Sequence, residues 1–168
     1  MPKLIMLEEL LPNPTEQEYD TELSITLPYE KRQKSRFRTT LNNGTEVGVT
    51  IERGSVLRGG DCLKSKQGDV VKILSADEQV STIQCDSAYD LARAAYHLGN
   101  RHVSLQVGDT WVRYLKDHVL DEMIKGFGLN VIHEQAPFEP EVGAYHGGHS
   151  HAHSHDDHSH SHSHDHQH

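Results

Sequence analysis

EQVSTIQC (78–85) followed by DSAYDLARAAYHLG (86–99) is the stretch of sequence that decides the fold. The first segment has the composition of a β-strand, and the second has a helical pattern. Ser87 and Asp90 form a capping box, so they mark where the helix starts, and Gly99 is placed to end it. The predicted apolar face of this helix consists of Leu91, Ala94, Ala95 and Leu98.

The sequence after this helix predicts a second, similar set of elements. RHVSLQV (101–107) and TWVRYL (110–115) are predicted strands, and Gly108-Asp109 turns the chain between them. Asp117 can cap a second helix, and LNVIHE (129–134) is predicted as a last strand. The apolar stripe of the second helix is Leu120, Met123, Ile124 and Phe127. The order β-α-β-β-α-β is that of the ferredoxin-like unit.

The first half of the chain has a different pattern, with apolar residues at every second position. This alternation in TELSITL (21–27) and EVGVTIE (46–52) is typical of half-buried strands, and VVKIL (70–74) adds another apolar run. We therefore expect an α+β protein with three parts. These are an N-terminal all-β domain over 1–75, a ferredoxin-like domain over 76–145 and a His-rich tail over 146–168.

The tail holds eleven of the chain's 15 histidines and no Lys or Arg. Neutral imidazoles bind borderline transition metals, and their unperturbed pKa near ~6.5 leaves most of them neutral at pH 7. The tail has almost no apolar residues to bury, so we predict that it is disordered until metal binds. The predicted tail ligands are His146, His149, His151, His153, His155, His158, His160, His162, His164, His166 and His168.

Composition restricts the function of the remaining 145 residues. They carry 22 acidic against 16 basic residues, which disfavours nucleic acid as a partner. We interpret the one basic stretch, KRQKSRFR (31–38), as a solvated strand edge. No segment has the ~20 apolar residues of a membrane span, and the N-terminus has no signal-peptide pattern, so we expect a cytoplasmic protein without membrane contact. Cys62 and Cys85 are isolated and are predicted to be reduced, buried thiols.

Four histidines lie outside the tail. In a ferredoxin-like unit, His97, His102 and His118 should all fall at one end of the sheet, and the last strand should carry His133 toward that end and release the tail nearby. Each also has a structural explanation: His97 can flank a helix C-terminus, and His133 can face solvent from its strand. Outside the tail, the sequence has no HExxH, CxxC or His-x-His motif, so spacing alone does not define a metal site there.

Three motifs in order give the chain a resemblance to a known family. YHLGNRHVSLQ (96–106), DHVLDEMIKGFGL (117–129) and PFEPEVGAY (137–145), followed by a His-rich end, resemble the UreE family of urease accessory proteins. The resemblance is looser over 1–75, where the family has a domain likened to the peptide-binding unit of Hsp40-type chaperones.

The resemblance implies a nickel metallochaperone, not an enzyme, that delivers Ni²⁺ for assembly of the urease active site. Its partners would be the urease apoprotein and the urease accessory proteins, including the accessory GTPase. It also implies a homodimer in which His102 of each subunit holds one shared metal, with His118 as an accessory ligand. The chain departs from the family at Lys116, where some members have another histidine.

Other functions use the same residues or the same topology. A general buffer for Zn²⁺, Cu²⁺ or Ni²⁺ would need the same imidazoles, because affinity alone does not select nickel. A peptide-binding chaperone would use the β-rich first half. An acylphosphatase-like enzyme needs a phosphate-binding loop after the first strand, which QCDSAYD (84–90) does not provide. An RNA-recognition domain needs clustered aromatic and basic residues that RHVSLQV lacks.

Overall fold

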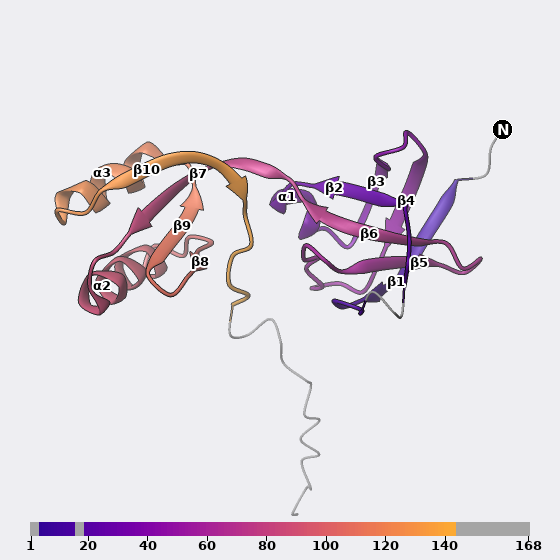
Figure 1. Ribbon diagram of the computed structural model, residues 1–168, viewed down its shortest axis with the longest axis horizontal. Coiled ribbons are helices and arrows are strands. Elements are labelled where there is room, and N and C mark those ends of the chain that lie inside the picture. The colour runs from indigo at the N-terminus through magenta and orange to yellow at the C-terminus, as the bar shows by residue number, and fades with distance from the viewer. Residues whose placement is uncertain (1–3, 16–18, 144–168) are drawn as a thin grey trace, which may run out of the picture.

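The computed structural model describes residues 4–15 and 19–143. They form two β-rich units that lie side by side (Figure 1). The strands β7 (Asp77–Gln84) and β10 (Val131–Pro137) belong to the second unit and extend toward the first. The expected α+β class is confirmed in this form, with few helices and many strands. Among the described residues, no helix is long and apolar enough to cross a membrane.

The first unit is a six-stranded sheet in the order β2-β6-β5-β1-β4-β3. Its central strand β1 pairs in parallel with β4 and antiparallel with β5. The bounds are β1 Ile5–Leu11, β2 Ser24–Leu27, β3 Arg36–Thr40, β4 Glu46–Thr50, β5 Cys62–Ser65 and β6 Val70–Ser75. The strands predicted at 21–27, 46–52 and 70–74 are confirmed as β2, β4 and β6.

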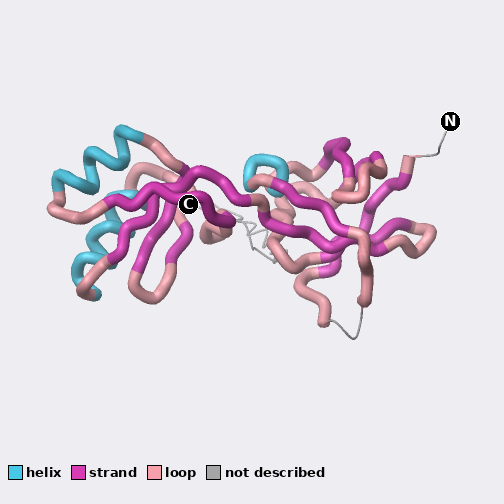
Figure 2. Tube along the Cα trace, turned by 45° about the horizontal axis from the view of Figure 1, so that its top comes forward, coloured by secondary structure: helices cyan, strands magenta, loops and turns pink. Residues whose placement is uncertain are grey.

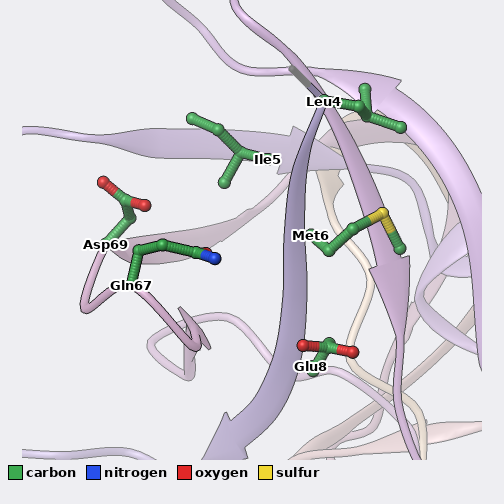
Figure 3. Close-up of a pocket in the computed structure, with 6 residues that line it drawn as sticks. All are labelled: Leu4, Ile5, Met6, Glu8, Gln67 and Asp69. Atoms are coloured by element: carbon green, nitrogen blue, oxygen red, sulfur yellow. The ribbon is translucent and has the colours of Figure 1, made fainter.

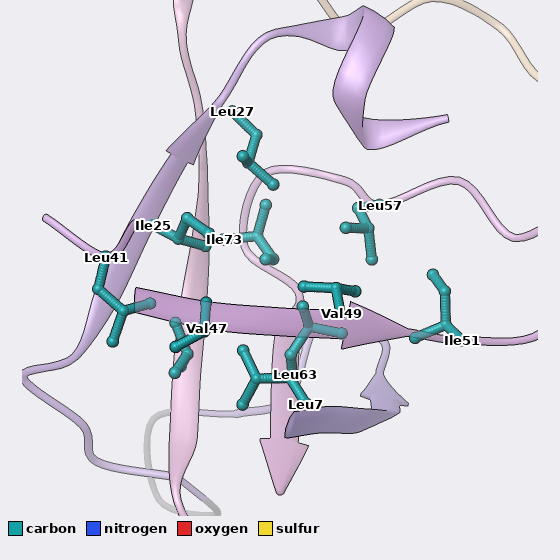
Figure 4. Close-up of a cluster of buried hydrophobic side chains, with 11 residues drawn as sticks. Leu7, Ile25, Leu27, Leu41, Val47, Val49, Ile51, Leu57, Leu63 and Ile73 are labelled. Atoms are coloured by element: carbon teal, nitrogen blue, oxygen red, sulfur yellow. The ribbon is translucent and has the colours of Figure 1, made fainter. Parts of the chain in front are cut away.

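Alternating residues of these strands build the first core. Ile25, Leu27, Val47 and Val49 of the alternating segments are buried, and they share one core with Leu7 from β1 and Leu57 from a loop (Figure 4). The fully or nearly fully buried members are Leu7, Ile25, Leu27, Leu41, Val47, Val49, Ile51, Leu57, Leu63, Val71 and Ile73.

The prediction of an all-β first half needs one correction. One turn of helix, α1 (Tyr29–Arg32), follows β2 after Pro28. It also changes the interpretation of the basic stretch at 31–38. Arg36 and Arg38 are exposed on the edge strand β3, as predicted, but Arg32 is 0% exposed.

The second unit has the predicted order of elements. Its four strands form an antiparallel sheet in the order β10-β7-β9-β8. The two longer helices lie toward the end of the molecule farthest from the first sheet (Figure 2). The remaining bounds are α2 Ala88–Gly99, β8 Gln106–Val107, β9 Trp111–Leu115 and α3 His118–Gly126. Both helices bury their predicted stripes in one core, with Ala94, Leu98, Leu120 and Ile124 the most buried helical members.

The helix starts are as predicted. The Ser87 hydroxyl accepts a hydrogen bond from the Asp90 amide, and the Asp117 carboxylate accepts from the amides of Val119 and Leu120. The end of α2 differs in detail. The helix ends at Gly99, but the left-handed residue that follows is His102, with φ of +56°. The strand predicted over 101–107 is wrong for 101–105, because only Gln106 and Val107 pair with β9.

A buried junction joins the two units. Tyr29 of α1 packs edge-to-face on Phe138, with ring centroids 5.4 Å apart, and Val80 of β7 completes this small core. The Tyr29 amide donates to the Glu78 carboxylate at 3.0 Å. The first unit therefore contacts both the strand that enters the second unit and the segment that leaves it.

Candidate metal centre

His102 lies on an exposed turn rather than at the start of a strand. Its amide donates to the Gly99 carbonyl at 3.0 Å, and the Arg101 amide donates to the Leu98 carbonyl at 3.1 Å, so the turn continues directly from α2. Histidine is one of the residues that adopt a left-handed backbone conformation more often than most non-glycine residues. The turn holds the imidazole outside the core, where a ligand can reach it.

The His102 turn lines a groove between the two units, with a volume of about 640 Å³. Tyr29, Gln33 and Val56 of the first unit contribute to it, so the groove belongs to both halves of the chain. From the second unit it is lined by Ala95, Gly99, His102, Val103, Ser104, Leu105 and Val107. Its remaining lining is Glu141, Val142 and Gly143, the last described residues of the chain.

His118 is the first residue of α3 and is exposed. Lys116, just before this helix, lines a small cavity of about 190 Å³ together with His133.

His133 is fixed by a buried carboxylate. Its Nε2 lies 2.7 Å from Oδ2 of Asp121, while 43% of the His133 side chain remains exposed. The Tyr114 hydroxyl donates to the other oxygen of Asp121 at 2.7 Å. Burial raises the pKa of Asp121, but the hydrogen bonds from Tyr114 and His133 outweigh it, and the pKa lies below its ordinary value. His133 thus faces solvent from its strand, as expected, and also contacts the buried Asp121 carboxylate.

His97 has a packing role. Its ring stacks on Phe127 with centroids 4.3 Å apart, and the Arg93 guanidinium lies 4.6 Å from the same Phe127 ring. This supports the structural explanation for His97, although the contact is with an aromatic ring and not with the helix end alone.

The register supports one part of the expected geometry. Pro137 pairs with Asp77, Leu115 pairs with Val80, and Gln106 pairs with Arg113, so the His102 turn, the start of α3 and the end of β10 lie at one end of the sheet. The imidazoles themselves are not gathered. Within residues 4–15 and 19–143, no three His, Cys, Asp or Glu side chains lie close enough to hold a metal ion. His97 faces Phe127, His102 lines the groove, and His133 contacts Asp121.

The eleven tail histidines, His146 to His168, lie outside the described residues. The chain reaches them through the groove, where the Glu141 amide donates to the Leu105 carbonyl at 2.8 Å. The described chain thus ends in the groove that His102 also lines.

A second cavity, of about 360 Å³, lies on the first unit beside β1 (Figure 3). Leu4, Met6 and Ile5 give it an apolar wall, and Glu8, Gln67 and Asp69 supply its polar atoms. It contains no imidazole or thiol, so the histidine chemistry of the described residues belongs to the second unit and the groove.

Sequence reasoning missed the part of the site that the first unit supplies. The buried Arg32 and the partly exposed Glu139 form an ion pair at 3.1 Å across the junction, and they hold the segment that enters the groove. Neither residue has a neighbour in sequence that predicts this contact. The only sequence signal was an arginine three residues after the aromatic Tyr29.

Comparison with known proteins matches both halves of the chain to one family. The model of the UreE urease accessory protein N-terminal domain matches residues 7–76, and that of the C-terminal domain matches residues 78–168. A protein named urease accessory protein UreE from Alkalilimnicola ehrlichii is 55% identical over 144 residues, 86% of each chain. A protein of the same name from Saccharophagus degradans is 48% identical over 144 residues, which is also 86% of each chain. One from Pseudomonas putida strain W619 is 55% identical over 123 residues, 73% of this chain and 76% of the other.

Proposed function

Because the chain belongs to the UreE family of urease accessory proteins, with a role in urease maturation, we propose that it is a nickel metallochaperone. It binds Ni²⁺ as cargo and delivers it for assembly of the urease active site, without being an enzyme itself. Its partners are the urease apoprotein and the urease accessory proteins, including the accessory GTPase, and it acts in the cytoplasm.

One observation carries the proposal: an exposed imidazole, His102, lies in the groove through which the chain reaches its His-rich end. A single imidazole does not bind Ni²⁺ tightly, so the site needs further ligands. A second copy of His102 and the tail histidines supply them. Histidine ligands with open coordination positions allow exchange, whereas a closed tetrahedral site retains its ion.

The surface around His102 fits a homodimer. The outward face of α2, the helix that leads into the His102 turn, exposes Tyr89 (71%) and Tyr96 (67%). Exposed aromatic and apolar side chains are typical of subunit interfaces. In an isologous dimer built on this face, the two His102 side chains meet near the two-fold axis and share one ion.

Nickel titration by calorimetry tests the function in the full-length chain, with His102→Ala as the main variant. We expect the tightest binding event to disappear, because the substitution removes both shared ligands of the dimer. The weaker tail sites should remain. Lys116→Ala is the matched control at an exposed position of the same unit, and it should leave the titration unchanged.

The same titration with Zn²⁺ and Cu²⁺ separates a nickel carrier from a general buffer. A carrier should pass Ni²⁺ to urease apoprotein in the presence of the accessory proteins, and urease activity should fall with His102→Ala. Full activation by that variant at limiting nickel would contradict the proposal. Analytical ultracentrifugation of the metal-free chain measures whether it forms a dimer, independently of metal binding.

A further inference from the structure

We propose that Arg32 and Glu139 are positioning residues that fix the start of the His-rich segment beside His102. This rests on the proposed function, because it assigns a role in nickel binding to the junction between the units. The occupant of the groove is the chain's own C-terminal segment, residues 144–168, which follows directly from the residues that line it.

Arg32 is a fully buried cation whose contacts cross the junction. Its guanidinium donates to the carbonyls of Leu27 at 3.1 Å and Leu57 at 3.3 Å within the first unit. It also donates to the Phe138 carbonyl and pairs with the Glu139 carboxylate at 3.1 Å. A planar guanidinium presents several donors in fixed directions, which a lysine ammonium does not reproduce. Arg32 therefore binds the strap, residues 137–143, to the first unit.

Glu139 is the other half of this attachment. One carboxylate oxygen accepts from the Gly59 amide at 2.9 Å, and the other pairs with Arg58 at 3.2 Å. On the opposite side, the Glu139 amide donates to the Gln106 side chain at 3.0 Å. Glu139 thus connects the first unit to the strand that follows the His102 turn.

The strap then runs along that turn, where the Glu141 amide bonds the Leu105 carbonyl at 2.8 Å. His146 is the third residue after Gly143, the last lining residue. When Arg32 and Glu139 attach the strap to the first unit, the His-rich segment begins at the groove. Its histidines then have a high effective concentration at His102. Without the attachment, the free chain before His146 would begin near Pro137 and be about three times as long. Effective concentration falls roughly as the −3/2 power of linker length, so the tail's contribution should drop on the order of fivefold.

The test is a double-mutant cycle in full-length protein. Glu139→Gln removes the carboxylate that pairs with Arg32 and Arg58, and a second change replaces the eleven tail histidines with serine. We expect the tail histidines to tighten the His102 nickel site in the wild type and to do so about fivefold less in Glu139→Gln. Arg32→Lys should act in the same direction. Glu8→Gln is the matched control, since Glu8 is also ion-paired, at 3.4 Å to Lys66, but lies on β1 away from the strap.

Hydrogen exchange of the metal-free protein gives a second readout. The amides of residues 139 and 141 should lose protection in Glu139→Gln, while those of α2 keep theirs. An equal tail contribution in wild type and Glu139→Gln, or unchanged protection of the strap, would overturn the inference. If Arg32→Lys does not fold, Glu139→Gln alone decides. A tight nickel site that survives His102→Ala would instead refute the proposed function. The hydrogen-exchange result would still report whether Glu139 attaches the strap, because it is measured without metal.

Discussion

At the scale of the single residue, Arg32 shows how strongly context changes the role of a charge. Removing its guanidinium takes one donor from each of the carbonyls of Leu27, Leu57 and Phe138 and takes the buried cation from Glu139. We expect Arg32→Met to lower the free energy of unfolding by about 3 kcal/mol, measured by urea denaturation. Lys34→Met, which removes an exposed ion pair at 3.8 Å to Glu30, should change it by less than about 1 kcal/mol.

The lowered pKa of Asp121 predicts how the stability of the protein changes in acid. The pKa of this carboxyl is lower in the folded protein than its ordinary value, because the hydrogen bonds from Tyr114 and His133 outweigh burial. The folded state therefore gains stability from the ionised Asp121 above the ordinary carboxyl pKa of about 3.9, and loses it as the pH falls through the lower folded value. Denaturation between pH 6 and pH 2 should show this loss in the wild type and less of it in Asp121→Asn. Parallel pH curves for the two proteins would contradict it.

Single residues also mark the limit of sequence interpretation. His102 could be singled out from its motif and its place after a helix, but its left-handed backbone could not, because Gly99 was the residue expected to end the helix. Arg32 was grouped with Arg36 and Arg38 because the three are close in sequence. The contact that buries Arg32 comes from Phe138 and Glu139, and a local pattern carries no information on partners so far along the chain.

At the scale of elements, local signals were reliable where local chemistry decides. The caps at Ser87 and Asp117 and the apolar stripes of α2 and α3 follow from hydrogen bonds and contacts within a few residues. The strand predicted over 101–107 failed because the Leu105 carbonyl accepts from Glu141 in the strap instead of pairing in the sheet. Alternating apolar residues predict burial on one side, and this segment obtains that burial without a long strand.

The β8–β9 hairpin offers a prediction at this scale. A Cβ added at Gly108 would lie 2.3 Å from the Trp111 ring, too close for any adjustment that keeps the indole in place. We expect Gly108→Ala to destabilise the protein by about 1–3 kcal/mol. Trp111 is the only tryptophan, so its fluorescence reports the local change.

Gly126→Ala is the control for the hairpin variant. This glycine is the last residue of α3, and a Cβ there would meet nothing within 4 Å. Alanine has the higher helix propensity, so the substitution should leave stability unchanged or raise it by up to about 1 kcal/mol. A loss equal to that of Gly108→Ala would show that the clash with Trp111 is not the cause.

At the scale of the whole molecule, the tail and the folded units should be separable in nickel binding. Deleting residues 146–168 removes no described core residue, so the shortened chain should remain a folded dimer. Its nickel stoichiometry should fall to about one ion per dimer, held by the His102 pair. Equal stoichiometry with and without the tail, measured by calorimetry, would refute the role of the tail as a reservoir.

Proton competition gives the accompanying pH dependence. Metal binding needs neutral imidazole, so tail-bound Ni²⁺ should dissociate as the pH falls from about 7 to 5. Equilibrium dialysis of the full-length chain across this range measures the loss. Binding that is undiminished at pH 5 would indicate carboxylate or thiolate ligands instead.

The buried junction also has a consequence for the order of events during synthesis. A ribosome releases the first unit, with Arg32, long before it adds Phe138 and Glu139. Until then the nascent first half carries a guanidinium whose partners in the second unit do not yet exist, and the Tyr29 ring has no Phe138 to pack against. Nor can β10 pair with β7 along its whole length before Pro137 emerges. The N-terminal unit, although made first, reaches its final form only when the last strand arrives.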